Sequence, residues 1–203
     1  MKTSEKFSMK VTDYVNARLP DKTEEDLEII RYGLEVLFMN FTKLPIILGI
    51  GYLLGVFSYT FYTLIMFGLI RMFAGGIHAK KSYNCLLSML VMIFGSIYLS
   101  LNYRTSGLMK VIIFLVTICI YFRYAPADTE EKPYLDSLIR KQLKIKSMVT
   151  AIIYFFISIT IKDMFFSNMF IHVLWIEGIV ILPITYKLLK RRYNNYEHYS
   201  ENI

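Results

Sequence analysis

One uncharged stretch, LPIILGIGYLLGVFSYTFYTLIMFGLI at residues 44–70, decides the fold class of this 203-residue chain. A membrane-spanning helix needs roughly 20 mostly apolar residues, with about 17 as the lower limit. The stretch of 27 residues is therefore long for one helix and short for two ideal ones. Because three glycines near its middle offer places to turn, we expect two short or tilted segments, at 42–57 and 59–73. A single long helix is the alternative.

The rest of the chain continues this apolar pattern. Only 19% of the residues are charged and 55% are hydrophobic, whereas soluble proteins keep about a quarter of their residues charged. Four more apolar blocks follow at about 86–103, 107–124, 147–163 and 168–188. The sequence therefore predicts an all-α integral membrane protein with about six transmembrane helices, in a single domain. Its expected parts are cytoplasmic or interfacial helices at 1–41, a transmembrane bundle at 42–188 and a cytoplasmic tail at 189–203.

The positions of the basic residues agree with six spans. If the N-terminus is cytoplasmic, every Lys and Arg lies on the cytoplasmic side except Arg104, Lys110 and Lys162. Cytoplasmic loops of membrane proteins carry this excess of basic residues. We therefore expect both termini in the cytoplasm, and we assign the net charge of +7 to contacts with membrane lipids rather than nucleic acid.

An amphipathic helical region is expected ahead of the first span. Apolar residues recur at helical spacing from Phe7 to Leu19, which is typical of a helix lying on a membrane surface. Thr23 and Asp26 then form the pattern of a capping box that starts a second helix. Either this region presents a platform to an amphipathic peptide, or it simply anchors and packs.

The segment that bears reactive side chains is RMFAGGIHAKKSYNC, residues 71–85. A histidine imidazole can take the proton of a cysteine thiol, so His78 is a candidate general base and Cys85 a candidate nucleophile. Nearby cations would favour the reactive thiolate. These cations are Arg71, Lys80 and Lys81.

Helix geometry sets a condition on this dyad. Seven residues along a regular helix separate the two side chains by about 10 Å, far beyond a hydrogen bond of roughly 3 Å. Residues 79–84 therefore cannot be continuous helix in a working dyad, and Gly75 and Gly76 permit a break before them. Spare backbone N–H groups of such a turn would suit an oxyanion hole. The alternative is a histidine that anchors at the interface and a cysteine that only packs.

Other polar residues have simpler interpretations. Cys119 is expected to be a packing residue, and two cysteines without a Cys-x-x-Cys pair indicate neither a disulfide framework nor a metal site. Glu177 lies inside the sixth apolar block, where a charge is costly. We expect its side chain to face the bundle interior or to pair with a cation. The guesses for a carboxylate that orients the histidine are Glu35 and Asp128.

Four residues form a pattern that resembles a known family: Arg71, Gly76, His78 and Cys85. The pattern is similar to that of the accessory gene regulator protein B (AgrB) family of bacterial membrane peptidases. A second block, YAPADTEEKP at 124–133, resembles the loop that follows the fourth segment in that family. A looser third match covers residues 31–43. The resemblance extends over almost the whole chain, with similar length and segment order.

The resemblance implies a specific chemistry. Such proteins are cysteine endopeptidases that cleave the C-terminal tail from an AgrD-like quorum-sensing propeptide. By that likeness Cys85 would form an acyl-enzyme thioester, with His78 as the base, and an internal cysteine or serine of the peptide would close a thiolactone or lactone ring. Arg71 would have an electrostatic or orienting role, and Gly76 with Gly75 a backbone role. The resemblance further implies no cofactor, a bacterial cell membrane location and a homodimer.

Six further residues are candidates for binding the peptide substrate: Lys80, Lys81, Glu35, Arg140, Lys141 and Lys144. Two other functions stay open, a non-catalytic peptide-binding scaffold and a peptide exporter. A scaffold would not depend on Cys85, whereas an exporter would use polar residues within its spans, which here offer little beyond Glu177.

Overall fold

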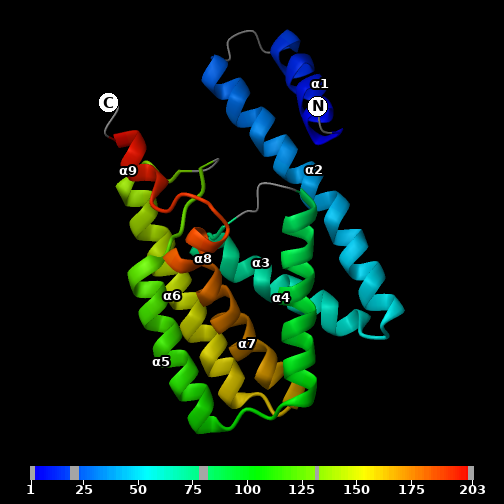
Figure 1. Ribbon diagram of the computed structural model, residues 1–203, viewed down its shortest axis with the longest axis vertical. Helices are drawn as coiled ribbons and strands as arrows, with labels where there is room; N and C mark the ends of the chain where they lie inside the picture. The colour runs from blue at the N-terminus through cyan, green and yellow to red at the C-terminus, as the bar shows by residue number, and fades with distance from the viewer. Residues whose placement is uncertain (1–2, 19–22, 78–81, 131–132, 201–203) are drawn as a thin grey trace. The chain divides into compact units, whose positions relative to one another are not determined.

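The structure, a computed structural model, describes residues 3–18, 23–77, 82–130 and 133–200 (Figure 1). Within these ranges every named element is an α-helix. The chain divides into two compact units, residues 1–57 and 58–203. The helices are α1 (Thr3–Arg18), α2 (Glu24–Leu53), α3 (Phe57–Ala74), α4 (Ser82–Asn102), α5 (Gly107–Tyr124), α6 (Ser137–Thr160), α7 (Met164–Val180), α8 (Pro183–Leu188) and α9 (Asn195–Ser200).

The first unit contains α1 and α2, which pack on each other. The Phe7 ring stacks on Phe38 with 5.1 Å between centroids. The predicted capping box is confirmed, because the Asp26 N–H donates to Thr23 Oγ1 and the Thr23 N–H donates to Asp26 Oδ2, both at 3.2 Å. From this cap α2 continues without interruption to Leu53, so the predicted second helix and the predicted first span are one helix.

The chain breaks between α2 and α3, as the two-segment interpretation of residues 44–70 predicts. Three residues separate the helices, and Gly55 among them has a φ of +70°. Backbone at this φ is readily adopted by glycine and strained for other residues. The alternative of one long helix is therefore wrong.

In the part of the chain that the structure describes, four helices are long and apolar enough to cross a membrane: α3, residues 83–102 of α4, α5 and α6. Two apolar helical stretches are shorter, Phe41–Leu53 and α7. The expected count of about six spans is therefore not confirmed. The last predicted block, 168–188, is interrupted because α7 ends at Val180 and α8 begins with Pro183, a residue that favours the first position of a helix.

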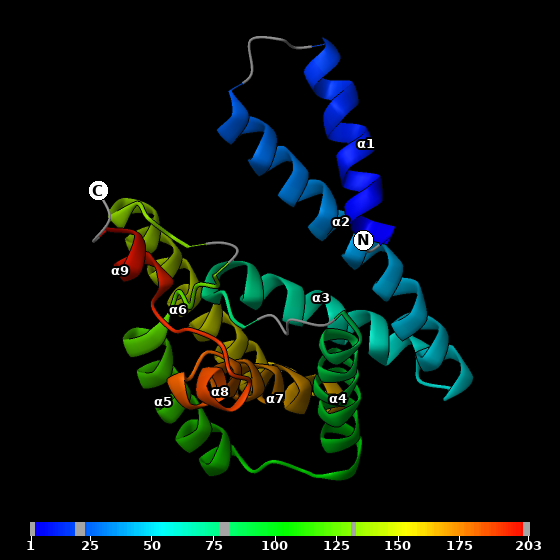
Figure 2. The same ribbon diagram turned by 45° about the horizontal axis from the view of Figure 1, so that its top comes forward.

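The core of the second unit is α7, which packs against α4, α5 and α6 (Figures 1 and 2). Most of its side chains are buried, as expected of a helix that is apolar all round. By contrast α5 and α6 keep large apolar side chains exposed, among them Leu115, Val116 and Val149. Such wide exposed apolar faces mark a surface that meets another apolar phase, which agrees with a membrane protein.

A short strap, defined here as residues 125–130 after α5, is bound to the end of α3. The Ala127 N–H donates to the Ala74 carbonyl at 2.8 Å, and the Gly76 N–H donates to the Ala127 carbonyl at 2.9 Å. Gly75 between them has a φ of +74°, and a Cβ built on it would overlap the Ala127 carbonyl oxygen. The close approach of the two segments therefore requires glycine at this position.

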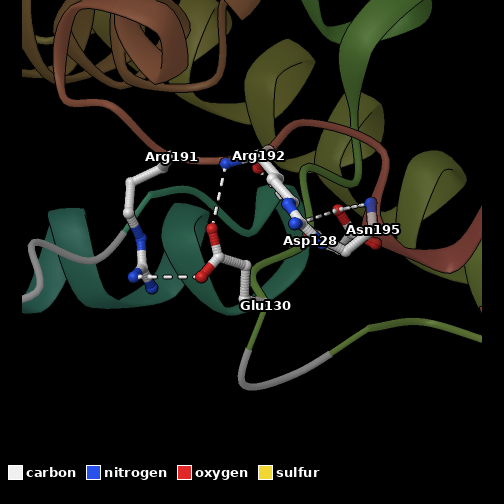
Figure 3. Close-up of polar contacts among 5 residues, drawn as sticks. All are labelled: Asp128, Glu130, Arg191, Arg192 and Asn195. Atoms are coloured by element: carbon white, nitrogen blue, oxygen red, sulfur yellow. Dashed lines mark hydrogen bonds and ion pairs between the residues drawn. The ribbon is translucent and has the colours of Figure 1, made fainter. Parts of the chain in front are cut away.

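The other side of the strap holds the C-terminal tail (Figure 3). Asp128, which is buried, accepts hydrogen bonds from the backbone N–H groups of Asn195 and Tyr196 at 2.9 and 2.8 Å. Glu130 forms an ion pair with Arg191 at 3.4 Å. A carboxylate at the start of a helix satisfies N–H groups that have no intrahelical partner, so Asp128 fixes α9 and the tail to the strap.

We predict that Gly75→Ala lowers the free energy of unfolding by about 2 kcal/mol, because a side chain is both strained at this φ and blocked by Ala127. Thermal unfolding in detergent measures the change. Gly68→Ala is the matched control, since that glycine lies in α3 with nothing within 4 Å of a built Cβ. Equal unfolding temperatures for the two variants would contradict the close approach.

We predict that Asp128→Ala releases the C-terminal tail, because three hydrogen bonds to Asn195 and Tyr196 are lost. Trypsin should then cut after Arg191 or Arg192 about tenfold faster, as expected when local opening costs about 1.4 kcal/mol less. Asp136→Ala is the control, because Asp136 caps α6 instead. A tail equally resistant in both variants would show that Asp128 does not hold it.

Candidate functional site

Cys85 lies in the first turn of α4, partly exposed, on the wall of a cavity of about 350 Å³. Arg71 and Ile77 line the cavity from the end of α3 and the segment after it. Val180 of α7 and Thr185 of α8 complete the opposite wall. Most of the remaining lining is apolar and comes from α4. Among the described residues, the lining therefore combines a thiol and a guanidinium with mostly apolar side chains.

Arg71 connects the segment after α3 to the central helix α7. Its Nη2 donates to the Ile77 carbonyl at 2.6 Å, and its Nη1 lies 3.5 Å from Glu177 Oε2. Glu177 is fully buried, and within the described residues neither of its carboxylate oxygens accepts a hydrogen bond. The planar guanidinium can serve a carbonyl and a carboxylate at once, which a lysine ammonium does less well. The expectation that Glu177 faces inward or pairs with a cation is confirmed in both parts.

Gly76 allows the chain to pass close to this ion pair. Its φ is +131°, and a Cβ built on it would lie 3.2 Å from Glu177 Oε1, 3.2 Å from Val180 Cγ1 and 3.6 Å from Arg71 Cζ. Contacts at 3.2 Å are tighter than normal van der Waals packing, and the backbone conformation itself favours glycine. Gly75 and Gly76 thus each combine a positive φ with a close neighbour, and their role in the reaction stays a prediction.

The structure brings together Cys85, Arg71 and Gly76, but it does not test the whole predicted site. His78 lies outside the described residues, and so do Lys80 and Lys81. The described helix α4 begins at Ser82, so the geometric condition on residues 79–84 also stays a prediction. The Glu35 side chain is likewise outside the described part of the chain.

Arg140, Lys141 and Lys144 line a second cavity, of about 530 Å³, which we call the basic cavity. It lies between the end of α5, the first turns of α6 and the C-terminal tail. None of its lining residues lines the cavity of Cys85. The structure therefore separates these three candidates for substrate binding from the candidate nucleophile. The full lining is Arg123, Tyr124, Ala125, Pro126, Arg140, Lys141, Lys144, Tyr193, Asn194, Tyr196 and Glu197.

The two tail tyrosines of the basic cavity are neutral at physiological pH. The pKa of Tyr193 is raised to about 12, mainly because the side chain is buried and to a smaller extent because Tyr196 lies nearby. Burial also raises the pKa of Tyr196, and the hydrogen bond from its hydroxyl to Glu197 acts in the same direction. Both side chains therefore keep their hydroxyl protons and add no negative charge to the basic cavity.

Comparison with known proteins decides the family. The family described as Accessory gene regulator B matches residues 8–181. The chain belongs to the AgrB family. It is 32% identical to a putative AgrB-like protein of Clostridium acetobutylicum over all of this chain and 99% of that protein. It is 33% identical to a putative AgrB-like protein of Listeria innocua, with 87% of each chain covered.

A further relative has a more specific name. The accessory gene regulator protein B of Staphylococcus aureus strain MW2 is 31% identical over 77% of this chain and 83% of that protein. No solved structure matches the chain. Membership of the AgrB family agrees with a role in quorum sensing, and the apolar helices agree with a membrane location.

Several features of the site in this AgrB-family chain were missed by the sequence analysis. The position of Glu177 within an apolar block predicted that its side chain would face the interior or pair with a cation. Nothing in the sequence identified Arg71 as that cation. The sequence also did not predict that Val180 and Thr185 line the Cys85 cavity. The predicted sixth segment was continuous, whereas α7 ends at Val180. Cys119, expected to be a packing residue, is instead exposed on α5, so that expectation is wrong for the described structure.

We predict that Arg71→Ala lowers the free energy of unfolding by about 3 kcal/mol, because it leaves the Glu177 carboxylate buried without its cation. Denaturant titration in mixed micelles measures the change. The double variant Arg71→Ala/Glu177→Ala should cost at least about 1 kcal/mol less than the sum of the two single variants. Arg104→Ala, at an exposed loop position, is the control and should change stability by less than about 0.5 kcal/mol. Strict additivity would mean that the pair is not coupled.

Proposed function

We propose that this protein is a membrane-embedded cysteine endopeptidase that removes the C-terminal tail of an AgrD-like propeptide, with Cys85 as the nucleophile. The observation that supports it most directly is the cavity beside Cys85, which is large enough for a peptide segment and carries Arg71 on its wall. His78, one residue beyond Ile77, is the proposed base. Family membership supports the same reaction class.

The position of Cys85 in α4 suits an acyl transfer. The N–H groups in the first turn of a helix point toward its N-terminal end, where they can bind an anion, and Cys85 lies within the first turn of α4. Donors of this kind stabilise the oxyanion that forms when a carbonyl is attacked. The positive end of the helix dipole also favours the anionic form of a nearby nucleophile. We therefore assign the N-terminus of α4 the role of an oxyanion site.

The reaction proceeds in two balanced steps. Cys85 Sγ attacks the carbonyl carbon of the scissile amide while His78 takes the thiol proton. The C–N bond then breaks, the proton passes to the leaving amine, and the tail departs with a new amino terminus. A thioester between Cys85 and the remaining peptide is left.

In the second step a cysteine thiol or serine hydroxyl within the same peptide attacks the thioester carbonyl. The bond to Cys85 Sγ breaks, the proton of the attacking group returns to the thiol, and a thiolactone or lactone ring is closed. A thioester conserves acyl-transfer potential, so ring closure needs no nucleotide if water is excluded. The largely apolar lining of the cavity favours that exclusion.

We further propose that the protein lies in a bacterial cell membrane with both termini in the cytoplasm, because basic residues concentrate in alternate loops. Cleavage would then take place at the cytoplasmic face. The homodimer implied by the family resemblance stays a prediction.

Mass spectrometry on purified protein in lipid, mixed with a candidate propeptide, tests the activity. We predict that wild type releases the tail and carries a covalent peptide adduct that neutral hydroxylamine removes, as a thioester requires. Cys85→Ala and His78→Ala should lose at least about 10³-fold in rate, as for other nucleophile and base deletions. Cys119→Ala is the matched control and should keep both signals.

The same experiment separates the competing functions. Tail release that persists in Cys85→Ala would refute Cys85 as the nucleophile. A Cys85→Ala protein with unchanged peptide-dependent function would indicate a scaffold. An exporter would move intact peptide across liposomes and release no tail in detergent, where no compartments exist.

A further inference from the structure

The basic cavity combines a concentration of positive charge with an exposed apolar surface. Its described lining contains four cations and one acidic residue, Glu197. That carboxylate accepts hydrogen bonds from Asn194 Nδ2 and the Tyr196 hydroxyl at 2.9 and 3.1 Å. The cavity therefore has an excess of positive charge, and its complement is an anion.

These cations lie where the exposed apolar face of α5 ends. Arg123 lies in the last turn of α5, directly after the exposed Phe122 ring. Lys144 Nζ lies 5.5 Å from the centroid of that ring. Lysine side chains at such a boundary place their stems along apolar groups and their charge at the polar edge. The charged rim and the apolar face of α5 are thus continuous.

The spacing on α6 repeats this arrangement. Lys141 is flanked on its own helical face by Leu138, one turn before, and Ile145, one turn after. Both apolar side chains are exposed, at 67% and 52%. A ligand that binds Lys141 therefore meets apolar surface at the same time. A soluble anion would make no use of that surface, whereas acyl chains would cover it.

Two neutral tyrosines complete the lining of the basic cavity. Tyr193 and Tyr196 keep their hydroxyl protons at physiological pH, and tyrosine is a residue typical of the membrane interface. Arg140 is already fixed, since its Nη1 donates to the carbonyls of Tyr134 and Leu135 at 2.6 and 2.8 Å and its Cζ lies 4.2 Å from the Tyr196 ring. Arg140 therefore shapes the cavity, and Arg123, Lys141 and Lys144 provide its more adaptable charges.

We infer that the basic cavity binds the phosphate of an anionic phospholipid headgroup, with the acyl chains lying along the exposed faces of α5 and α6. Basic pockets between membrane helices bind headgroups of this chemistry. An acidic peptide is less favoured, because the cavity shares no lining residue with the cavity of Cys85. The inference is independent of the peptidase activity, and a protein without that activity would still bind the lipid.

Native mass spectrometry of the full chain in a non-ionic detergent, titrated with phosphatidylglycerol, tests the site. The triple variant Arg123→Gln/Lys141→Gln/Lys144→Gln removes three cations that line the cavity, and it spares the structural Arg140. We expect its dissociation constant for the lipid to be at least tenfold higher than that of wild type. The charge-matched control, Lys187→Gln/Lys190→Gln/Arg192→Gln, changes exposed basic residues outside the lining and should stay within twofold.

Two further probes identify the source of the anion. Glycerol 3-phosphate carries the phosphate without acyl chains and should bind at least 100-fold more weakly than phosphatidylglycerol. A soluble peptide of six glutamates should not displace the lipid. Equal loss of lipid in the two triple variants would overturn the inference. So would tight binding of glycerol 3-phosphate, or displacement of the lipid by the acidic peptide.

Discussion

The guanidinium of Arg71 connects α3, the chain just before His78 and the central helix α7. It donates to the Ile77 carbonyl and pairs with the fully buried Glu177. An unpaired carboxylate inside an apolar helix would cost several kcal/mol. Removal of the cation therefore requires either that α7 moves or that Glu177 becomes protonated. The position of the Ile77 carbonyl is thereby linked to the packing of the core, and one wall of the Cys85 cavity follows from it.

The rest of the site extends outward from this pair through backbone contacts. Gly76 passes the ion pair because it has no Cβ, and its N–H then binds the Ala127 carbonyl of the strap. One residue further on, Asp128 binds the start of α9. The C-terminal tail is therefore joined to the candidate site through a few consecutive hydrogen bonds, and its first residue, Leu189, also lines the Cys85 cavity. Glycine at two adjacent positions is what allows the segments to lie this close.

Local features of the fold were predictable from the sequence, and distant partners were not. The capping box at Thr23 and the break near Gly55 depend on residues within a few positions of each other, so pattern and propensity were sufficient. The pairing of Asp128 with Asn195 joins residues 67 apart, and no periodicity reports on such a contact. For Glu177 the cost of burial predicted a cation but not its identity. The count of about six spans is not confirmed. Hydropathy alone also did not detect the helix break before Pro183.

The strap lines the basic cavity and is also hydrogen-bonded to the end of α3, next to Arg71. Ala125 and Pro126 line the basic cavity, while the next residue, Ala127, forms the two hydrogen bonds to the end of α3. A ligand in the basic cavity thus contacts the same short segment that positions Gly76 beside Arg71. Coupling between two sites requires a shared element whose arrangement both of them bias. The strap has the connections for that role, because Ala127 is hydrogen-bonded both to Ala74 and to Gly76.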